Sequence, residues 1–465
     1  MRVAVIGAGI AGLTAAFRLR LAGEEPVVFE AQAQTGGVIG TERIEGFLVE
    51  FGPTTIQAAN PVLDVLIRDT GLEPDRLPAS KTARKRYIVR DGKPVAAPNS
   101  PADLVTNSLF SARAQRRALR EPLIPRSRPT EEESVADFAR RRFGPEALDY
   151  GMDPLVAGVY GGDPKRLAIR HAFPGIWRME QESGSIVRAL LRGRKDKKSR
   201  MASGMFSFRK GLGQLPEALS DALGDRLRLS TPVRRLERQG ARWIVSGDCL
   251  LGGHEQTAWS ESFDAVVYAA PLHALASIAL PEGPSLKPLT NVVYAPLVVT
   301  AMGFRREHVG HPLDGFGMLV PGVERSIRIL GTLFTSSIFS GISSASSTFQ
   351  SDIARAPAGH VLLTTIIGGM RNPALASLPE KEAYDLVLGD LRRLLDISGE
   401  PVFRWHTSWK LAVPQYNIGY GKTLAAIERL EASWPGWFMA GNYRMGVSIG
   451  DAAKSGEEAA RRCLL

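Results

Sequence analysis

Apolar runs separated by polar breaks divide the chain into short strands and amphipathic helices. An apolar strand at 3–6 runs directly into a glycine-rich turn and a helix, and the next apolar run ends at Glu30. A helical pattern follows at 60–75. Near the other end, a strand at 436–442, a glycine-bearing turn and a helix at 451–464 repeat this order. The pattern predicts an α/β nucleotide-binding fold assembled from both ends of the chain.

The central part of the chain has a different pattern. Asp91-Gly92 separates two short apolar runs and predicts a hairpin at 84–98. Residues 100–204 combine helical spacing with prolines at turns and many basic side chains. A helix is predicted at 211–224, and strands predominate after it. These strands are expected as a pair at 226–247 and singly at 263–271, 292–304, 315–321 and 360–370, with one helix at 379–395.

The first turn carries a dinucleotide-binding fingerprint. It consists of Gly7, Ala8, Gly9, Ile10, Ala11 and Gly12. The first glycine permits a tight turn, the second lets the backbone approach a pyrophosphate, and the third lets helix and strand pack closely. The helix amino terminus attracts the anion, and Glu30 can accept a hydrogen bond from a ribose hydroxyl. The alternative is an ordinary strand–turn–helix whose glycines serve packing alone.

A second glycine pair, Gly36-Gly37, indicates which dinucleotide is bound. A nicotinamide enzyme needs no such pair at this place, whereas the stretch 35–55 resembles the second nucleotide motif of flavoproteins shaped like amine oxidases and glutathione reductase. Within that resemblance, Glu50 and the turn Gly52-Pro53-Thr54-Thr55 lie beside the flavin ring. The sequence therefore favours FAD as the cofactor.

The expected fold class is α/β with α+β parts, and the division is discontinuous. A Rossmann-like FAD-binding domain is expected from residues 1–85, 205–285 and 405–465. Residues 86–204 form a mainly helical, possible membrane-associated lobe in this division, and residues 286–404 form a mixed-sheet substrate-binding domain. At 465 residues with 44% apolar content, the chain is long enough for more than one core.

Charge and cysteine content narrow the function classes. The net charge of +10 suits nucleic acid, anionic lipid, an acidic ligand or simply a basic surface, but no nucleic-acid-binding module is recognisable, so no nucleic-acid partner is expected. Cys249 and Cys463 lie far apart without a Cys-x-x-Cys partner, which indicates a reducing compartment. The histidines lack metal-ligand spacing, and no metal is expected. No secretion signal or membrane-spanning apolar stretch is recognised, which predicts a cytoplasmic protein.

Over nearly its full length the chain resembles the oxygen-dependent porphyrinogen oxidases. The stretches that carry the resemblance are GAGIAG, GGVIGT, KRYIV, MDPLVAGVYGGDPKRLAIRHAFP, GLGQLPEAL, VVYAPLVV, GFGMLVP, IIGGMRNP, VPQYNIGY and GNYRMGVSIGD. Two positions depart from the family's usual pattern: Ala452 stands where cysteine is frequent, and Tyr420 where histidine is frequent. The related amine oxidases commonly have arginine after the glycine pair and an acidic residue at the closing strand, whereas this chain has Val38 and Asn442.

The resemblance implies FAD held without a covalent bond. It implies a main-chain contact from Val233 to the adenine and a segment around Asn442 that closes over the flavin. At Gly446-Val447, free amides and a helix start also suit the flavin carbonyls on physical grounds. The expected FAD-binding residues are Gly7, Ala8, Gly9, Ile10, Ala11, Gly12, Glu30, Ala31, Gly36, Gly37, Val38, Gly52, Pro53, Thr54, Thr55, Val233, Gly441, Asn442, Gly446, Val447, Ser448 and Ile449.

Three residues are expected at the substrate. The resemblance favours Arg86 as the partner of a substrate propionate, because a guanidinium offers a carboxylate two hydrogen bonds; its alternative is an ordinary surface arginine. Leu319 and Ile366 would form the walls of an apolar slot, although strand residues of this kind are usually core. No essential catalytic base is inferred, because aromatisation of the macrocycle supplies much of the driving force.

The activity implied is oxidation of protoporphyrinogen IX to protoporphyrin IX by molecular oxygen, with release of hydrogen peroxide, in haem biosynthesis. Two alternatives stay open: oxidation of coproporphyrinogen III, and a non-catalytic FAD-binding protein that docks on membranes. The expected state is a monomer or homodimer, with a possible contact to ferrochelatase. Peripheral attachment to the inner face of the cell membrane is expected through the lobe, with Arg113, Arg116, Arg117 and Arg120 facing the headgroups and Leu109 and Phe110 entering the interface.

Overall fold

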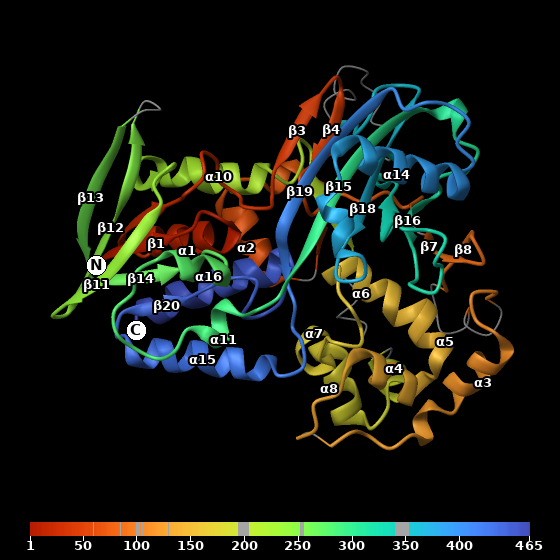
Figure 1. The fold of residues 1–465 in the computed structure, drawn as a ribbon, viewed down its shortest axis with the longest axis horizontal. Helices are drawn as coiled ribbons and strands as arrows, with labels where there is room; N and C mark the ends of the chain where they lie inside the picture. Colours follow the sequence, from red (N-terminus) through yellow and green to blue (C-terminus); the bar gives the residue numbers. More distant parts are fainter. Residues whose placement is uncertain are drawn as a thin grey trace.

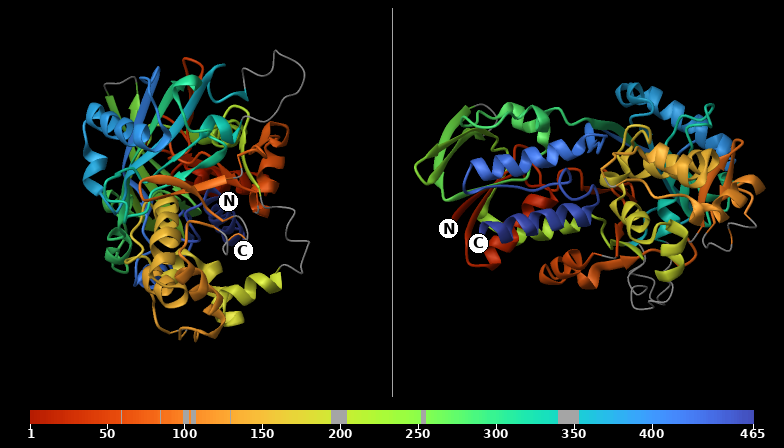
Figure 2. Two further views of the ribbon diagram at one scale, coloured as in Figure 1. Left: turned by 90° about the vertical axis from the view of Figure 1, so that its right-hand side faces the viewer. Right: turned by 90° about the horizontal axis from the view of Figure 1, so that it is seen from below.

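Two large sheets and a group of helices organise the chain in the computed structural model (Figure 1). A five-stranded sheet lies at the end that holds both chain termini, and a seven-stranded sheet lies at the other end (Figures 1 and 2). Helices from the middle of the chain lie at the lower right of Figure 1. The structure describes residues 1–58, 60–83, 85–98, 103, 107–128, 130–193, 204–251, 255–339 and 353–465.

The five-stranded sheet is parallel and joins distant parts of the chain. Its order is β10-β2-β1-β14-β20. The strands are β1 (Arg2–Ile6), β2 (Glu25–Phe29), β10 (Leu227–Arg228), β14 (Ala265–Tyr268) and β20 (Trp437–Met439). Because helices or further strands cover both faces, the strands are apolar runs rather than alternating ones. The carboxyl ends of all five strands therefore meet at one edge, where open α/β sheets bind ligands.

Helices pack on both sides of this sheet. The helices α1 (Ile10–Leu21), α2 (Pro61–Asp69), α10 (Gln214–Leu223) and α16 (Ile449–Cys463) share one core. A second core joins the sheet to α15 (Tyr420–Ser433) and to a three-stranded sheet. That sheet consists of β11 (Val233–Gln239), β12 (Arg242–Leu251) and β13 (Glu255–Phe263). The helices α1 and α16 pack so closely that a Cβ at Gly456 would lie 2.1 Å from the carbonyl oxygen of Ala11.

The seven-stranded sheet is mixed, with the order β19-β15-β18-β17-β16-β7-β8. Its strands are β7 (Lys85–Arg90), β8 (Lys93–Ala96), β15 (Tyr294–Arg305), β16 (Gly315–Leu319), β17 (Gly331–Leu333), β18 (His360–Gly368) and β19 (Phe403–Pro414). One face packs against α14 (Glu380–Leu395), where Val387 and Leu391 share a core with Val298 and Leu363. The opposite face of the sheet points away from α14 and contacts other parts of the chain.

Three strands of this sheet come from outside the segment expected to build it. The hairpin β7–β8 lies almost wholly in the stretch assigned to the helical lobe, and most of β19, from residue 405 onward, lies in the stretch assigned to the FAD-binding domain. Register explains the difference, because Leu319 of β16 pairs in parallel with Ile88 of β7, and Val299 of β15 pairs with Thr407 of β19. A local hydrophobic pattern carries no information on such distant pairing.

Outside the hairpin β7–β8, the described residues of the stretch 86–204 form helices and the loops between them. Its longer helices are α3 (Ala112–Leu119), α4 (Val135–Phe143), α6 (Asp153–Tyr160), α8 (Pro174–Ser183) and α9 (Ile186–Gly193). A buried ion network holds the lobe together: the Arg142 guanidinium, which is 0% exposed, bonds the carboxylates of Glu121 and Glu180. Removing one member of such a network costs about 3 to 5 kcal/mol, because its partner charge stays buried.

The expected apolar contact of the lobe with lipid needs correction. Leu109 is 1% exposed and packs inside the protein, so it cannot enter an interface. The most exposed large apolar side chains among the described residues of the lobe are Leu119 and Leu123, at 70% and 79% exposure. Within the part of the chain that the structure describes, no helix is both long and apolar enough to cross a bilayer.

Candidate functional site

The glycine turn after β1 has the geometry of a nucleotide-binding loop. Gly7 adopts a φ of +101° that favours glycine, and its N–H donates to the Phe29 carbonyl at 2.8 Å. A Cβ at Gly12 would lie 1.9 Å from the Gly7 carbonyl oxygen, so a side chain there would break the packing of helix on strand. A Cβ at Gly9 would meet nothing within 4 Å, so a ligand can approach the backbone there.

The amino terminus of α1 is free to bind an anion. No side chain caps it at Gly9, and its first turn contains no acidic residue. The Glu30 carboxylate fixes the loop beside it, because Oε2 accepts from the Ala8 N–H at 2.6 Å and Oε1 from the Gln32 N–H at 2.9 Å. A carboxylate oxygen can accept more than one hydrogen bond, so Glu30 can hold the loop and a ribose hydroxyl together.

The second glycine pair lies against the first loop. The Gly36 N–H donates to the Ala8 carbonyl at 2.9 Å, and a Cβ at Gly37 would lie 3.6 Å from the Gly9 Cα. A Cβ at Gly52 would lie 2.6 Å from the Val38 carbonyl oxygen, so the turn 52–55 joins the same group. The structure thus brings together segments that the sequence assigned to the phosphate and to the flavin.

The turn before α16 reaches this edge from the other end of the chain. Ser448 caps the helix, with its Oγ accepting from the Asp451 N–H at 3.1 Å. Gly446 has a φ of +148°, and a Cβ there would lie 2.3 Å from Asp451 Oδ2. Gly450 packs on Asn60, the cap of α2, and this contact brings the α16 terminus to the first segment of the chain.

Val233 lies close to the ribose end of this group. It begins β11 and is 7% exposed. Two residues before it, the Thr231 N–H donates to the Glu30 carbonyl at 2.8 Å. The strand that carries the expected adenine contact is therefore tied to the residue expected at the ribose.

The three residues expected at the substrate share one face of the seven-stranded sheet. Leu319 pairs with Gly331 of β17, and Gly331 pairs with Ile366 of β18. Directly paired residues point to the same face, as do residues two apart on one strand. Arg86 precedes Ile88, the partner of Leu319 on β7, by two residues. All three therefore lie on the face opposite α14.

On this face Arg86 lies on β7, and the apolar residues Leu319 and Ile366 lie on β16 and β18. Leu319 and Ile366 flank a glycine, so no side chain projects between them. The helix α6 lies across from them, because a Cβ at Gly158 would be 2.9 Å from Leu319 Cδ2. Arg86 is exposed, lies 5.5 Å from the Phe316 ring centre and has no carboxylate partner among the residues that the structure describes.

One buried carboxylate, Glu50, was expected beside the flavin ring only as the end of a strand. Glu50 ends the apolar strand β4 (Phe47–Glu50), is 3% exposed and accepts hydrogen bonds from the Leu212 N–H at 3.0 Å and from the Thr41 hydroxyl. Burial raises the pKa of Glu50 to about 7, and the nearby Arg355 guanidinium opposes this shift only in part. The signal in the sequence was a charged residue closing a fully apolar strand.

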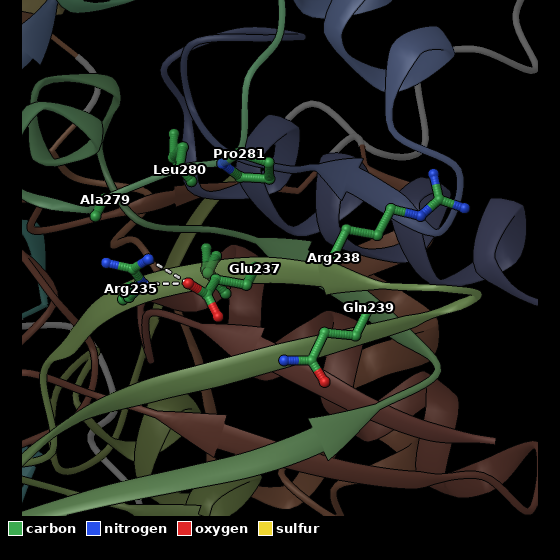
Figure 3. Close-up of a pocket in the computed structure, with 8 residues that line it drawn as sticks. Arg235, Glu237, Arg238, Gln239, Ala279, Leu280 and Pro281 are labelled. Carbon is green, nitrogen blue, oxygen red and sulfur yellow. Dashed lines mark hydrogen bonds and ion pairs between the residues drawn. The ribbon is translucent and has the colours of Figure 1, made fainter.

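Two surface pockets lie elsewhere. One of about 320 Å³ is formed by β11 and residues 279–281, with an ion pair between Arg235 and Glu237 at its rim (Figure 3). Another of about 630 Å³ lies in the lobe beside Arg141. Neither includes a residue of the glycine loop, so neither belongs to the nucleotide site.

Together these features define a nucleotide-binding fold, and comparison with known proteins identifies its family. Residues 10–464 match the model of the family described as flavin containing amine oxidoreductase. The chain belongs to this family. It is an FAD-dependent oxidoreductase, and the free α1 terminus, the open backbone at Gly9 and the Glu30 carboxylate fit that cofactor.

Its relatives narrow the class further. The chain is 36% identical to the mitochondrial protoporphyrinogen oxidase of Nicotiana tabacum, over 99% of this chain and 94% of the tobacco protein. It is 26% identical to the coproporphyrinogen III oxidase of Bacillus subtilis, over 98% of this chain and 96% of the other.

Solved structures show the same fold. A crystal structure from Exiguobacterium covers 99% of this chain and 98% of its own, with a TM-score of 0.81 at 22% identity. Reduced UDP-galactopyranose mutase covers 100% and 95%, with a TM-score of 0.72 at 17% identity.

Proposed function

We propose that this chain oxidises protoporphyrinogen IX to protoporphyrin IX, using molecular oxygen and releasing hydrogen peroxide, in haem biosynthesis. The observation that carries the proposal is the 36% identity to a protoporphyrinogen oxidase along almost the whole of both chains. Identity to the coproporphyrinogen III oxidase is lower, at 26%. Coproporphyrinogen III is the alternative substrate.

The role of the cofactor-binding residues is to hold FAD in place. The amides at the start of α1 receive the pyrophosphate, and Glu30 accepts from the ribose. The chemistry that FAD would supply there, when bound, is acceptance of a hydride. Asn442 and the amides of Val447, Ser448 and Ile449 would hold the flavin, and the positive end of the α16 dipole would stabilise negative charge there.

The sheet face opposite α14 receives the macrocycle. Leu319 and Ile366 contact its apolar surface and exclude water, while Arg86 pairs with a propionate. A methylene-bridged tetrapyrrole loses a hydride and a proton repeatedly until the ring is aromatic. The site must therefore orient the substrate and exclude water, and these tasks matter more than a strong base.

The two substrates are compared directly. Protoporphyrinogen IX and coproporphyrinogen III are prepared without oxygen, and the appearance of fluorescent porphyrin is followed after oxygen is admitted, with the uncatalysed rate subtracted. The proposal expects a higher kcat/KM for protoporphyrinogen IX. A higher value for coproporphyrinogen III would assign the alternative substrate, and no acceleration of either would overturn the oxidase function.

Arg86→Ala is expected to raise the KM for the porphyrinogen about tenfold or more, because a charged hydrogen bond is lost. FAD content should not change. Lys93→Ala removes an exposed charge from the neighbouring strand β8 and serves as the control. Normal KM with lost flavin in Arg86→Ala would move this residue from the substrate to the cofactor.

We also infer that the lobe docks on anionic membranes. The turn Glu121–Leu123 contacts α9, and Leu123 of the turn and Leu190 and Leu191 of α9 are all exposed. Arginines of α3 flank this apolar group, and each basic residue near such a surface contributes about 1 kcal/mol. A flat, poorly soluble product favours release at lipid.

Vesicle flotation measures the docking. We expect the protein to float with anionic vesicles at low salt and to stay in solution with neutral ones. Leu119→Gln with Leu123→Gln should abolish flotation, whereas Arg235→Gln with Arg238→Gln, at the pocket of Figure 3, should leave it unchanged. Equal flotation of both variants would contradict this surface.

A further inference from the structure

Two stacked tyrosines hold the turn that precedes α16. Tyr416 and Tyr420 are 3% and 4% exposed, and their ring centres lie 4.4 Å apart. Their hydroxyls donate to consecutive main-chain carbonyls: Tyr416 to that of Asn442, and Tyr420 to that of Tyr443 at 2.5 Å. The side chains of one segment thus fix two successive peptide groups of another.

The same turn is fixed from three further directions. The Tyr443 hydroxyl donates to the Tyr268 carbonyl, at the end of β14, at 3.2 Å. The Gly441 N–H donates to Ser455 Oγ at 3.0 Å. The Arg444 guanidinium bonds both carboxylate oxygens of Glu431, at 2.8 and 3.1 Å. Among the residues that the structure describes, the hydroxyls of Tyr416 and Tyr420 make the hydrogen bonds that join the turn to the segment 415–420.

That segment is bonded to the helical lobe. The Ala168 N–H donates to the Tyr416 carbonyl at 2.8 Å, and the Gln415 side-chain amide donates to the Tyr160 carbonyl at 2.9 Å. Tyr160 ends α6, the helix whose Gly158 faces Leu319. Direct contacts therefore run from the proposed substrate wall through α6 and Tyr416 to the turn.

The hydrogen bonds from the two tyrosine hydroxyls orient whole peptide groups of the turn. A peptide group is planar, so fixing its carbonyl oxygen also fixes the N–H on its other side. The bonds at Asn442 and Tyr443 therefore orient the N–H groups of Tyr443 and Arg444. Phenylalanine would fill the same volume, but it would leave these carbonyls without the hydroxyl donors that satisfy them here.

We propose that Tyr416 and Tyr420 are positioning residues that set how the turn 446–449 approaches the flavin, and that they link this approach to α6. The inference rests on the proposed placement of Asn442 and residues 447–449 at the flavin. Neither tyrosine contacts a reacting atom in this account; both act through the peptide groups that they hold.

The test uses Tyr416→Phe, Tyr420→Phe and the double variant. Tyr160→Phe is the matched control, because it also removes a buried hydroxyl, bonded to the Ala172 carbonyl at 2.8 Å, but leaves the turn untouched. Apoprotein is titrated with FAD to obtain Kd, and the absorption bands and midpoint potential of the bound flavin are recorded.

Each of the first two variants should raise the Kd for FAD about threefold to tenfold, the range of one lost hydrogen bond. Both should shift the flavin bands and the midpoint potential. Tyr160→Phe should keep all three values while losing a similar amount of thermal stability. If Tyr416→Phe and Tyr420→Phe change the flavin no more than Tyr160→Phe does, the positioning role is wrong.

Gly446→Ala separates this inference from the placement on which it rests. The added methyl would collide with Asp451 inside the turn, so it should alter Kd and the flavin bands if the turn lies at the flavin. No change in Gly446→Ala would overturn the placement and the inference together. A change in Gly446→Ala without one in the tyrosine variants would overturn the inference alone.

Discussion

Glu30→Arg is expected to yield a folded protein that purifies without FAD. The substitution removes the acceptor for the Ala8 and Gln32 N–H groups and replaces it with a cation that can only donate. Each hydrogen bond to the charged group is worth about 1.5 to 3 kcal/mol, and the ribose loses its acceptor as well. The visible flavin absorbance per mole of protein measures the effect.

Two controls accompany this variant. Glu25→Arg reverses a charge at the exposed start of the same strand and should retain full FAD. Glu30→Gln keeps one acceptor oxygen and should retain part of it. A Glu30→Arg protein with full occupancy would exclude the ribose role of Glu30, and a pellet that stays yellow after acid precipitation would exclude non-covalent binding.

Glu50→Gln is expected to stabilise the protein above neutral pH. The folded chain raises the pKa of Glu50 to about 7 from its usual 4.5, so between these values the folded state holds a proton that the unfolded state has lost. Raising the pH through this window therefore lowers the free energy of unfolding of the wild type, by roughly 3 kcal/mol from this group. Glutamine stays neutral, so the free energy of unfolding of the variant does not fall in this way as the pH rises.

Denaturant unfolding at several pH values gives the comparison. Below pH 4.5 the two proteins should be equally stable, and above pH 7 the variant should be the more stable one. Glu42→Gln changes an exposed carboxylate on the adjacent strand and should follow the wild type at every pH. A constant difference between Glu50→Gln and wild type across the range would show that the Glu50 carboxyl does not titrate in this window.

The nucleotide loop could be predicted because its parts lie close together in the sequence. Gly7, Gly12 and Glu30 act within one strand–helix–strand unit, where spacing alone determines which backbone groups meet. The strand order of the seven-stranded sheet could not be predicted in this way. Arg86 and Leu319 share a face through the parallel pairing of β7 with β16, and that pairing leaves no periodic trace in either strand.

The contacts made by Tyr416, Tyr420 and Glu50 could not be predicted from the sequence, for a different reason. Tyr416 and Tyr420 bond main-chain carbonyls, and every residue has a carbonyl, so nothing in the sequence marks the partner. Glu50 was placed beside the flavin only as the end of a strand. Its burial depends on Leu212 and Thr41, which reach it only after three segments have packed.

The order of strands in the parallel sheet also bears on how the cofactor is acquired. The ribosome delivers β1 and the glycine loop well before β14, β20 and α16. Until then the small-residue face of α1 that receives Gly456 is uncovered, and the sheet edge at β1 has no neighbour on one side. Closing contacts of such long sequence separation is slow. The nascent chain thus carries its nucleotide fingerprint for most of its synthesis without the partner segments that complete a site.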